Sequence, residues 1–196
     1  MEGYYSEQEM ETMGFRSFGK DVLLSRKASF YGAKSMSFGD NVRVDDYCIF
    51  IGNITLRSHI HIGGFCGLHA SMGSITMDDF STLSSNVTIY AASDDYSGRV
   101  MTNAVIPEVY KNTHFSDIRI EKHVIIGTGS TLLPDASVGE GAAVGAMSLV
   151  NKPIESWGIY AGIPCRRIND RSRELLQMEK EFTKNDVARN SFILAK

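Results

Sequence analysis

Cysteine, proline and long apolar runs are scarce in this chain of 196 residues, and each scarcity excludes a class of protein. The three cysteines, Cys48, Cys66 and Cys165, lie far apart and form no CxxC pair, which argues against a disulfide framework and a structural zinc site. No apolar run approaches the roughly 18 residues of a transmembrane helix, and the acidic start differs from a secretory signal peptide. We therefore expect a cytoplasmic protein with no membrane partner.

A large excess of charge of either sign is also absent. The 20 Lys and Arg residues are offset by 23 Asp and Glu residues, which gives a net charge of −3. Nucleic-acid-binding domains present a strongly basic face, so we expect no nucleic-acid partner. Hydrophobic residues make up 43% of the chain, which is enough for one globular domain with its own core.

An apolar residue recurs at every sixth position, in three blocks. These hexad positions are Phe38, Val44, Phe50, Leu56, Ile62 and Leu68, then Met77, Leu83 and Ile89, then Ile120, Ile126, Leu132, Val138, Val144 and Val150. A period of six matches neither the 3.6 residues per turn of a helix nor the two-residue repeat of a strand.

A second set of positions, two residues before each hexad position, is apolar or small throughout, from Met36 to Ser148. Glycine, asparagine and aspartate occupy many of the gaps, as in Gly39-Asp40-Asn41. One large and one small inward side chain per short strand, followed by a tight turn, is typical of a parallel β-helix with about 18 residues per coil. We therefore predict an all-β parallel β-helix. An antiparallel β-sandwich is the alternative, but it gives no reason for a strict period of six.

The hexads define a β-helix over residues 18–165, interrupted by a long loop insertion over residues 90–117. Loops of this length inside a compact domain are usually functional. We expect residues 1–17 to form an N-terminal helical segment, because Ser6 and Glu9 match a capping box.

Residues 166–196 are expected to form a C-terminal helical segment that covers an end of the coil. Their apolar residues Leu175, Leu176, Met178 and Phe182 have helical spacing. The charged residues between them predict a solvated outer face.

Two motifs end the repeat. They are Val144-Gly-Ala-Met-Ser-Leu-Val150-Asn-Lys152 and Gly158-Ile-Tyr-Ala-Gly-Ile-Pro-Cys-Arg166. Together with the hexads and the long loop, they resemble the left-handed β-helix acyltransferases over roughly residues 15–170. Within that family the chain resembles the galactoside and nucleotide-amino-sugar acetyltransferases, and it looks most like the N-acyltransferases of dTDP-linked 4-amino-4,6-dideoxyhexoses.

This resemblance implies a left-handed β-helix that uses acetyl-CoA or another acyl-CoA as co-substrate, without a metal. It also implies a homotrimer with acyl-CoA in the cleft between two copies, and a place in O-antigen or other cell-surface polysaccharide synthesis. By position in the family pattern, the coenzyme A contacts fall on Thr128, Ala146, Asn151, Lys152 and Arg166. Lys and Arg also suit the phosphates of coenzyme A on chemical grounds.

The family's catalytic histidine is missing from this chain. In the galactoside enzymes it follows an Asn-Val-Thr hexad, here Asn86-Val87-Thr88, and Asp94 takes its place. A hydroxyl acceptor needs a base such as histidine, whereas a neutral amine brings its own lone pair, and a carboxylate can orient that amine and accept its proton. We therefore predict that Asp94 is catalytic and that the substrate is a nucleotide-linked amino sugar, acylated by direct attack. The plainer alternative is a turn residue that bonds its own backbone.

Five further residues are expected to bind the acceptor: Asp95, Tyr96, Ser84, Ser85 and His69. A sugar O-acetyltransferase of the galactoside type, with His69 or His114 as the base, is the main alternative function. A metal enzyme like the γ-carbonic anhydrases would need three histidines gathered across a subunit interface, and a non-catalytic trimeric scaffold would need no site at all.

Overall fold

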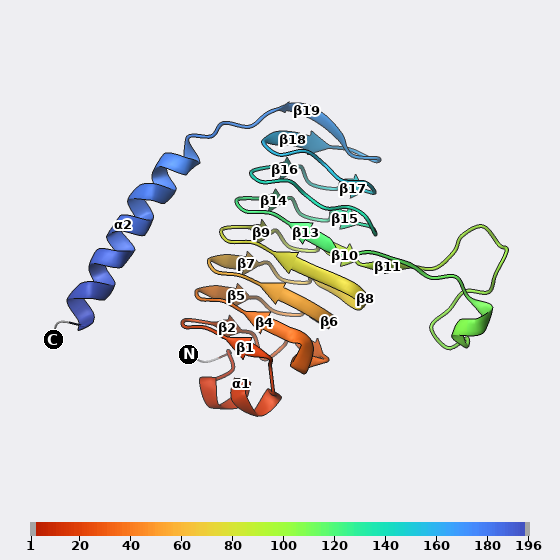
Figure 1. Ribbon diagram of the computed structural model, residues 1–196, viewed down its shortest axis with the longest axis horizontal. Coiled ribbons are helices and arrows are strands. Elements are labelled where there is room, and N and C mark those ends of the chain that lie inside the picture. Colours follow the sequence, from red (N-terminus) through yellow and green to blue (C-terminus); the bar gives the residue numbers. More distant parts are fainter. Residues whose placement is uncertain (1–2, 195–196) are drawn as a thin grey trace.

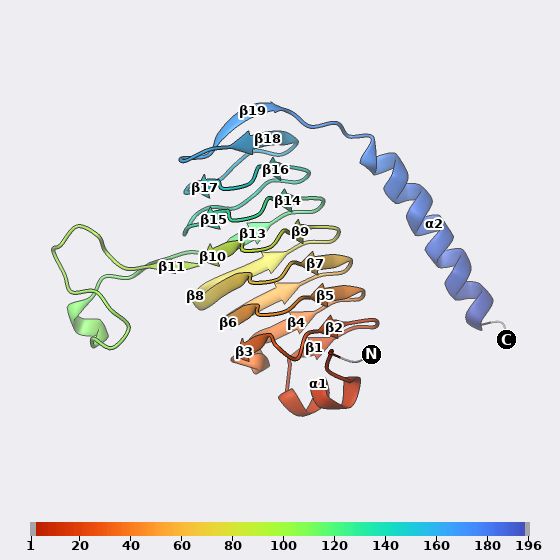
Figure 2. The ribbon, with the colours of Figure 1, turned by 180° about the vertical axis from the view of Figure 1, so that it is seen from behind.

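The chain forms one β-helix from which an arm and a helix project on opposite sides (Figure 1, and seen from behind in Figure 2). The computed structural model describes residues 3–194, with side chains described up to residue 184. The strands form two largely parallel sheets, of nine and eight strands, that wrap around the coil, so the predicted β-helix is confirmed.

Short strands line three faces of the coil. The first face holds β1 (Ser17–Phe18), β4 (Met36–Phe38), the second halves of β6 (Ile49–Leu56) and β8 (Gly67–Met77), and β13 (Ile118–Ile120). The second face holds β2 (Leu23–Leu24), β5 (Val42–Val44), β7 (Ile60–Ile62), β9 (Thr82–Leu83), β14 (Ile125–Ile126), β16 (Ala143–Val144) and β18 (Gly158–Ala161). The third face holds β3 (Ser29–Tyr31), the first halves of β6 and β8, β10 (Thr88–Tyr90), β15 (Thr131–Leu132) and β17 (Leu149–Val150).

The hexad residues fill the interior of this prism. Every residue of the large set and of the small set has at most 3% of its surface exposed, which confirms both sets. Parallel pairing stacks equivalent residues of neighbouring coils, as Phe50 stacks on Leu68. The core is therefore a column of repeated apolar contacts.

The corners of the prism contain residues with positive φ. The corner between the second and third faces, here the Asn86 corner, holds Tyr47, Phe65, Asn86, Gly129 and Met147. The corner between the first and second faces, here the His123 corner, holds Asp21, Asn41, His59, Phe80, His123, Gly141 and Trp157. Positive φ is uncommon outside glycine. Backbone hydrogen bonds between coils hold it here, as from Asn86 N–H to the Gly64 carbonyl at 3.0 Å.

The insertion over residues 90–117 leaves the coil at the corner between the third and first faces. Its base is a two-stranded antiparallel ribbon of β11 (Ala92–Ser93) and β12 (His114–Phe115), and it contains one 3₁₀ turn, η2 (Glu108–Tyr110). The coil resumes where Ile118 pairs with Ile75. The expected loop is therefore an arm with secondary structure of its own, as Figure 1 shows.

The N-terminal segment forms α1 (Glu7–Met13) with the predicted capping box. The Ser6 hydroxyl accepts a hydrogen bond from Glu9 N–H, and Ser6 N–H donates to Oε2 of Glu9 at 2.8 Å. Gly14 ends the helix with φ 73°. A 3₁₀ turn, η1 (Ala33–Ser35), lies farther along the chain, just before β4.

The C-terminal segment differs from its prediction in two ways. It begins with a strand, β19 (Arg166–Asp170), which pairs antiparallel with β18, and the helix α2 (Leu175–Leu194) follows. The helix lies along the His123 corner instead of covering an end of the coil. The reason is the aromatic row on that corner, against which Phe182 packs edge-on, with ring centroids 5.3 Å from His59 and 6.0 Å from Phe80. In the described part of the chain, neither helix has the length and apolarity needed to cross a bilayer.

Candidate active site

Four predicted site residues from two different groups meet at the Asn86 corner. Ser84 and Ser85 stand one coil below Thr128, and Ala146 is one coil further on. The Ser85 carbonyl accepts hydrogen bonds from Oγ1 of Thr128 at 2.6 Å and from Gly129 N–H at 3.1 Å. The structure thus joins the expected acceptor residues to the expected coenzyme A residues.

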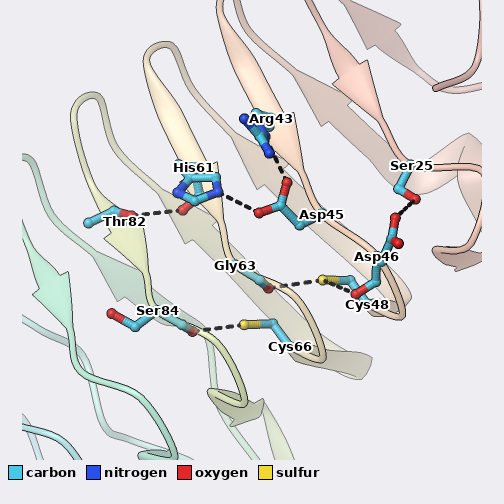
Figure 3. A network of polar contacts seen from close by, with 10 residues as sticks. All are labelled: Ser25, Arg43, Asp45, Asp46, Cys48, His61, Gly63, Cys66, Thr82 and Ser84. Atoms are coloured by element: carbon cyan, nitrogen blue, oxygen red, sulfur yellow. Dashed lines mark hydrogen bonds and ion pairs between the residues drawn. The ribbon is translucent and has the colours of Figure 1, made fainter. Parts of the chain in front are cut away.

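The backbone of this corner is held from inside the coil. The buried thiol of Cys66 donates to the Ser84 carbonyl at 3.1 Å, and Cys48 donates to the Gly63 carbonyl at 3.2 Å (Figure 3). Ser84 N–H donates to the Ile126 carbonyl at 2.9 Å. The Ser84 backbone is therefore fixed on both sides, while Ser85 is exposed.

His69 lies on the outer side of the third face. It lies within β8, because that strand runs on through the corner at Gly73. Its ring stacks on Tyr90 with centroids 4.7 Å apart. Burial lowers the pKa of His69, so its imidazole is neutral at pH 7 and is available as a hydrogen-bonding group or a base.

Asp94 lines a pocket of about 360 Å³ beneath the arm. Its Oδ2 accepts a hydrogen bond from Asn103 N–H at 3.1 Å. The same pocket contains Lys111, whose side chain is 6% exposed and pairs with Oε1 of Glu108 at 2.7 Å. The sequence analysis missed Lys111; its one signal is that it is the only lysine in the insertion.

Asp95 and Tyr96 do not line the Asp94 pocket. Oδ1 of Asp95 accepts a hydrogen bond from Ser97 N–H at 2.6 Å, and Oδ2 accepts one from Asn112 at 3.5 Å. The hydrogen bonds from Ser97 hold the pKa of Asp95 below its ordinary value. Tyr96 is 94% exposed. In this chain Asp95 shapes the loop and Tyr96 projects from it.

His114 belongs to the base of the arm. Its Nε2 lies 2.7 Å from Oδ2 of Asp135, and it does not line the Asp94 pocket. Among residues 3–184, whose side chains are described, no three of His, Cys, Asp or Glu come together in a way that could hold a metal ion.

Lys152 and Arg166 line one pocket of about 280 Å³ at the C-terminal end of the coil. Neither has an ion-pair partner among the described residues. Tyr160 and Arg167, which the sequence analysis did not single out, line the same pocket, whereas Asn151 is exposed outside it. The pocket can receive an anionic group through two uncommitted cations.

The Asp94 pocket and the Asn86 corner lie at opposite ends of β10. Ser84 and Ser85 precede this strand and Asp94 follows it, and neither serine lines the pocket. One chain therefore holds both parts of the predicted site without bringing them together.

Comparisons with known proteins support the prediction that this chain is an acyltransferase. A dTDP-4-amino-4,6-dideoxy-D-glucose acyltransferase from Escherichia coli is 42% identical over 190 residues, which are 95% of this chain and 98% of that protein. The crystal structure of the S84C mutant of AntD, an N-acyltransferase from Bacillus cereus in complex with dTDP-4-amino-4,6-dideoxyglucose and coenzyme A, is 43% identical. It covers 94% of this chain and 99% of its own, with a TM-score of 0.92.

A more distant relative has a different acceptor. A galactoside O-acetyltransferase from Lactococcus lactis is 30% identical over 174 residues, 84% of this chain and 70% of that protein. No protein-family model matches the chain. The higher identity and the nearly full coverage of the first two relatives show that this chain belongs to the hexapeptide-repeat acyltransferases, in the group of the dTDP-4-amino-4,6-dideoxyglucose acyltransferases.

Proposed function

We propose that this chain transfers an acyl group from acyl-CoA to the amine of a nucleotide-linked amino sugar, with dTDP-4-amino-4,6-dideoxyglucose as the first acceptor to test. The observation that carries the proposal is the carboxylate of Asp94 in the pocket beneath the arm, at the sequence position where the resemblance to the galactoside enzymes implies a histidine. A carboxylate suits an amine acceptor, since it orients the amine and takes up its proton. The two relatives with the highest identity, one named for this sugar and one bound to it, support the choice.

The reaction is a direct transfer. The lone pair of the amine attacks the carbonyl carbon of the thioester, a C–N bond forms, and an electron pair moves onto the carbonyl oxygen. Asp94 accepts one proton from the nitrogen. The C=O bond then re-forms, the C–S bond breaks, and the proton passes to the leaving thiolate, giving an amide and free coenzyme A.

A covalent acyl-enzyme has no support from the cysteines. Cys48, Cys66 and Cys165 are all buried, with at most 4% of their surface exposed. Burial raises the pKa of Cys165, so that thiol stays protonated and is a poor nucleophile.

Acyl-CoA is proposed to bind along the Asn86 corner. Lys152 and Arg166 offer cations to its phosphates at the C-terminal end of the coil. From there Ala146, Thr128 and Ser85 occupy successive rungs of the corner, about 4.8 Å apart, toward the acceptor. The backbone amides of these rungs suit the amide-rich arm of coenzyme A.

The complete site is proposed to form between copies in a homotrimer. Ser84 and Ser85 are separated from Asp94 by β10 and do not line its pocket, which supports this arrangement. The large apolar side chains exposed on the third face and the Asn86 corner support it as well: Tyr31, Tyr47, Ile49, Phe65, Tyr90 and Met147. A cytoplasmic location and a role in cell-surface polysaccharide synthesis, where amino sugars serve as building units, complete the proposal.

The acceptor is tested by thiol release from acetyl-CoA against dTDP-, UDP- and GDP-linked amino sugars and their hydroxyl counterparts. We expect turnover with an amino sugar and none with the matched hydroxyl compound. Turnover with hydroxyl acceptors alone would contradict the proposal and favour O-acetylation, with His69 or His114 as the base.

Subunit complementation tests the shared site. Asp94→Asn and Ser84→Ala are each expected to lose activity, and coexpression of the two variants should restore about a quarter of the wild-type rate per site, because random assortment pairs intact residues at that frequency. A site contained within one chain would show no recovery. Size-exclusion chromatography with light scattering provides the oligomeric state.

A further inference from the structure

The small inward residues of the coil bind the backbone of the Asn86 corner in a repeated way. Cys48 donates to the Gly63 carbonyl and Cys66 to the Ser84 carbonyl, as Figure 3 shows. Two coils beyond Ser84, the hydroxyls of Ser130 and Ser148 donate to the Gly145 carbonyl at 3.1 and 2.7 Å. In each case an inward side chain turns one corner carbonyl toward the interior.

An inward carbonyl sends the next amide outward. In a trans peptide the C=O and N–H groups point in opposite directions, and the Ser84–Ser85 peptide is trans. Because the Ser84 oxygen points at the buried Cys66 thiol, Ser85 N–H points away from the interior. Within residues 3–194, Ser85 N–H has no acceptor, so an oriented and uncommitted donor faces solvent beside Ser84.

We propose that Ser85 N–H stabilises the oxyanion of the transfer reaction and that Cys66 is the positioning residue that aims it. This inference rests on the proposed function. In the attack step, the carbonyl oxygen of the thioester gains negative charge when the C–N bond forms. An amide donor fixed before the reaction stabilises that charge without reorganising.

Three features of the corner support the assignment. The Ser84–Ser85 peptide packs directly on Gly63, where a Cβ atom would lie 2.8 Å from the Ser85 nitrogen, so only glycine at position 63 lets the peptide keep this place. Cys66 is buried, so water does not compete for the hydrogen bond that its thiol donates to the Ser84 carbonyl. Of the three rungs proposed to contact coenzyme A, Ser85 lies farthest from the pocket of Lys152 and Arg166. It therefore lies toward the thioester end of a coenzyme A bound along the corner.

The test compares Cys66→Ala with Cys66→Ser and with Cys48→Ala. Cys48 makes the same bond one coil away, to a peptide outside the predicted site, so it is a matched control. We expect kcat of Cys66→Ala to fall by about five- to tenfold, the loss of roughly one hydrogen bond, with the KM for acyl-CoA within about twofold. Cys66→Ser keeps a donor and should restore most of kcat. Cys48→Ala should stay within about twofold of wild type.

The outcomes separate this inference from the proposed function. Equal kcat values for Cys66→Ala and Cys48→Ala, or a rise in KM with kcat unchanged, would overturn the positioning role of Cys66. If wild type acylates only hydroxyl acceptors, the proposed acceptor is wrong, but the Cys66 and Cys48 comparison still decides the inference. No turnover by wild type on any acceptor would overturn both. Thermal melts check that each variant is folded.

Discussion

At the His123 corner, the protein covers its own aromatic row, whereas at the Asn86 corner it leaves a comparable row open. The rings of His59 and Phe80 stack with centroids 4.7 Å apart, His123 continues the stack at 5.3 Å, and α2 lies over them. The rings of Tyr47 and Phe65 stack at 5.0 Å on the other corner, and both are more than half exposed.

The polar contacts of the two corners also differ. A single nitrogen of Arg171 donates to the carbonyls of His123 at 2.8 Å, Gly141 at 3.0 Å and Ala142 at 3.3 Å. Glu179 of α2 pairs with Lys122 and His123. At the Asn86 corner, Ser85 N–H has no acceptor among the described residues.

The comparison shows how one sequence repeat produces a structural contact at one corner and a candidate binding surface at the other. Both corners follow the same hexad rule and the same positive φ, so the local sequence builds them alike. Coverage by α2 makes one corner a structural contact. Its absence leaves the other corner with exposed rings and oriented amides, the features expected of a binding surface.

The largest expected effect comes from replacing Asp94, the carboxylate that the proposal brings to the open Asn86 corner. Asp94→Asn should lower kcat by about 100-fold or more, since general-base contributions are typically of this size, without a change in melting temperature. Asp95→Asn is the matched control and should keep most activity, because its carboxylate bonds within the loop. Thiol release and thermal melts measure both. Equal losses in the two variants would contradict the role of Asp94.

Loss of the contacts that cover the His123 corner should lower the free energy of unfolding. Arg171→Met leaves the carbonyls of His123 and Gly141 without their donor, while that of Ala142 keeps its bond from Ile125 N–H, and the free energy of unfolding should fall by about 1–3 kcal/mol. Turnover per folded molecule should stay near wild type. Denaturant unfolding provides the measurement. A loss of kcat at unchanged stability would place the His123 corner in the active site and would contradict its purely structural role.

A third prediction concerns the cations proposed to hold coenzyme A at the end of the open corner. The double variant Lys152→Met and Arg166→Met should raise the KM for acyl-CoA by about tenfold or more, because hydrogen bonds to charged groups are worth about 1.5–3 kcal/mol. The kcat should stay unchanged, and the salt dependence of KM should weaken. Lys20→Met, on an exposed residue far from the pocket, is the control. An unchanged KM would place the phosphates elsewhere.

The smallest effect is a pH dependence of the covered corner. Burial raises the pKa of Glu179, but hydrogen bonds from Lys122 and His123 outweigh it, so the pKa lies below its ordinary value. A carboxyl group of this kind adds stability above its unfolded pKa, about 4.3, and the contribution disappears as the pH falls through the folded-state pKa. The difference in stability between wild type and Glu179→Gln should therefore narrow below about pH 4.

Melting curves from pH 7 to pH 3 test this prediction, with Glu155→Gln as a control on an exposed carboxylate. A difference that stays constant over this range would show that Glu179 does not contribute through its charge.

Much of the fold could be predicted because each hexad residue meets its equivalent one coil away. Residues such as Leu68 and Ile126 repeat the same contact, so the period alone shows which side chains lie inside. The position of α2 could not be predicted in this way. It depends on single contacts between residues far apart in sequence, such as Glu179 with His123.

The candidate site was predicted only in part. The sequence pointed to Ser84, Thr128 and Asp94, but nothing in it placed the first two on one corner and the third at the far end of β10. No sequence motif marks Lys111, because its side chain becomes buried only when the arm folds. The hydrogen bond from Cys66 to Ser84 was also hidden, since the sequence marks Cys66 only as a small inward residue.

The sequence by itself therefore determined the coil, its capped first helix and the place of its insertion, because these follow from repeated or local interactions. The tertiary structure alone decided which corner α2 covers, which amides stay free and which charged residues share a pocket. These features depend on long-range contacts that occur once in the molecule, and a periodic sequence pattern cannot predict such contacts.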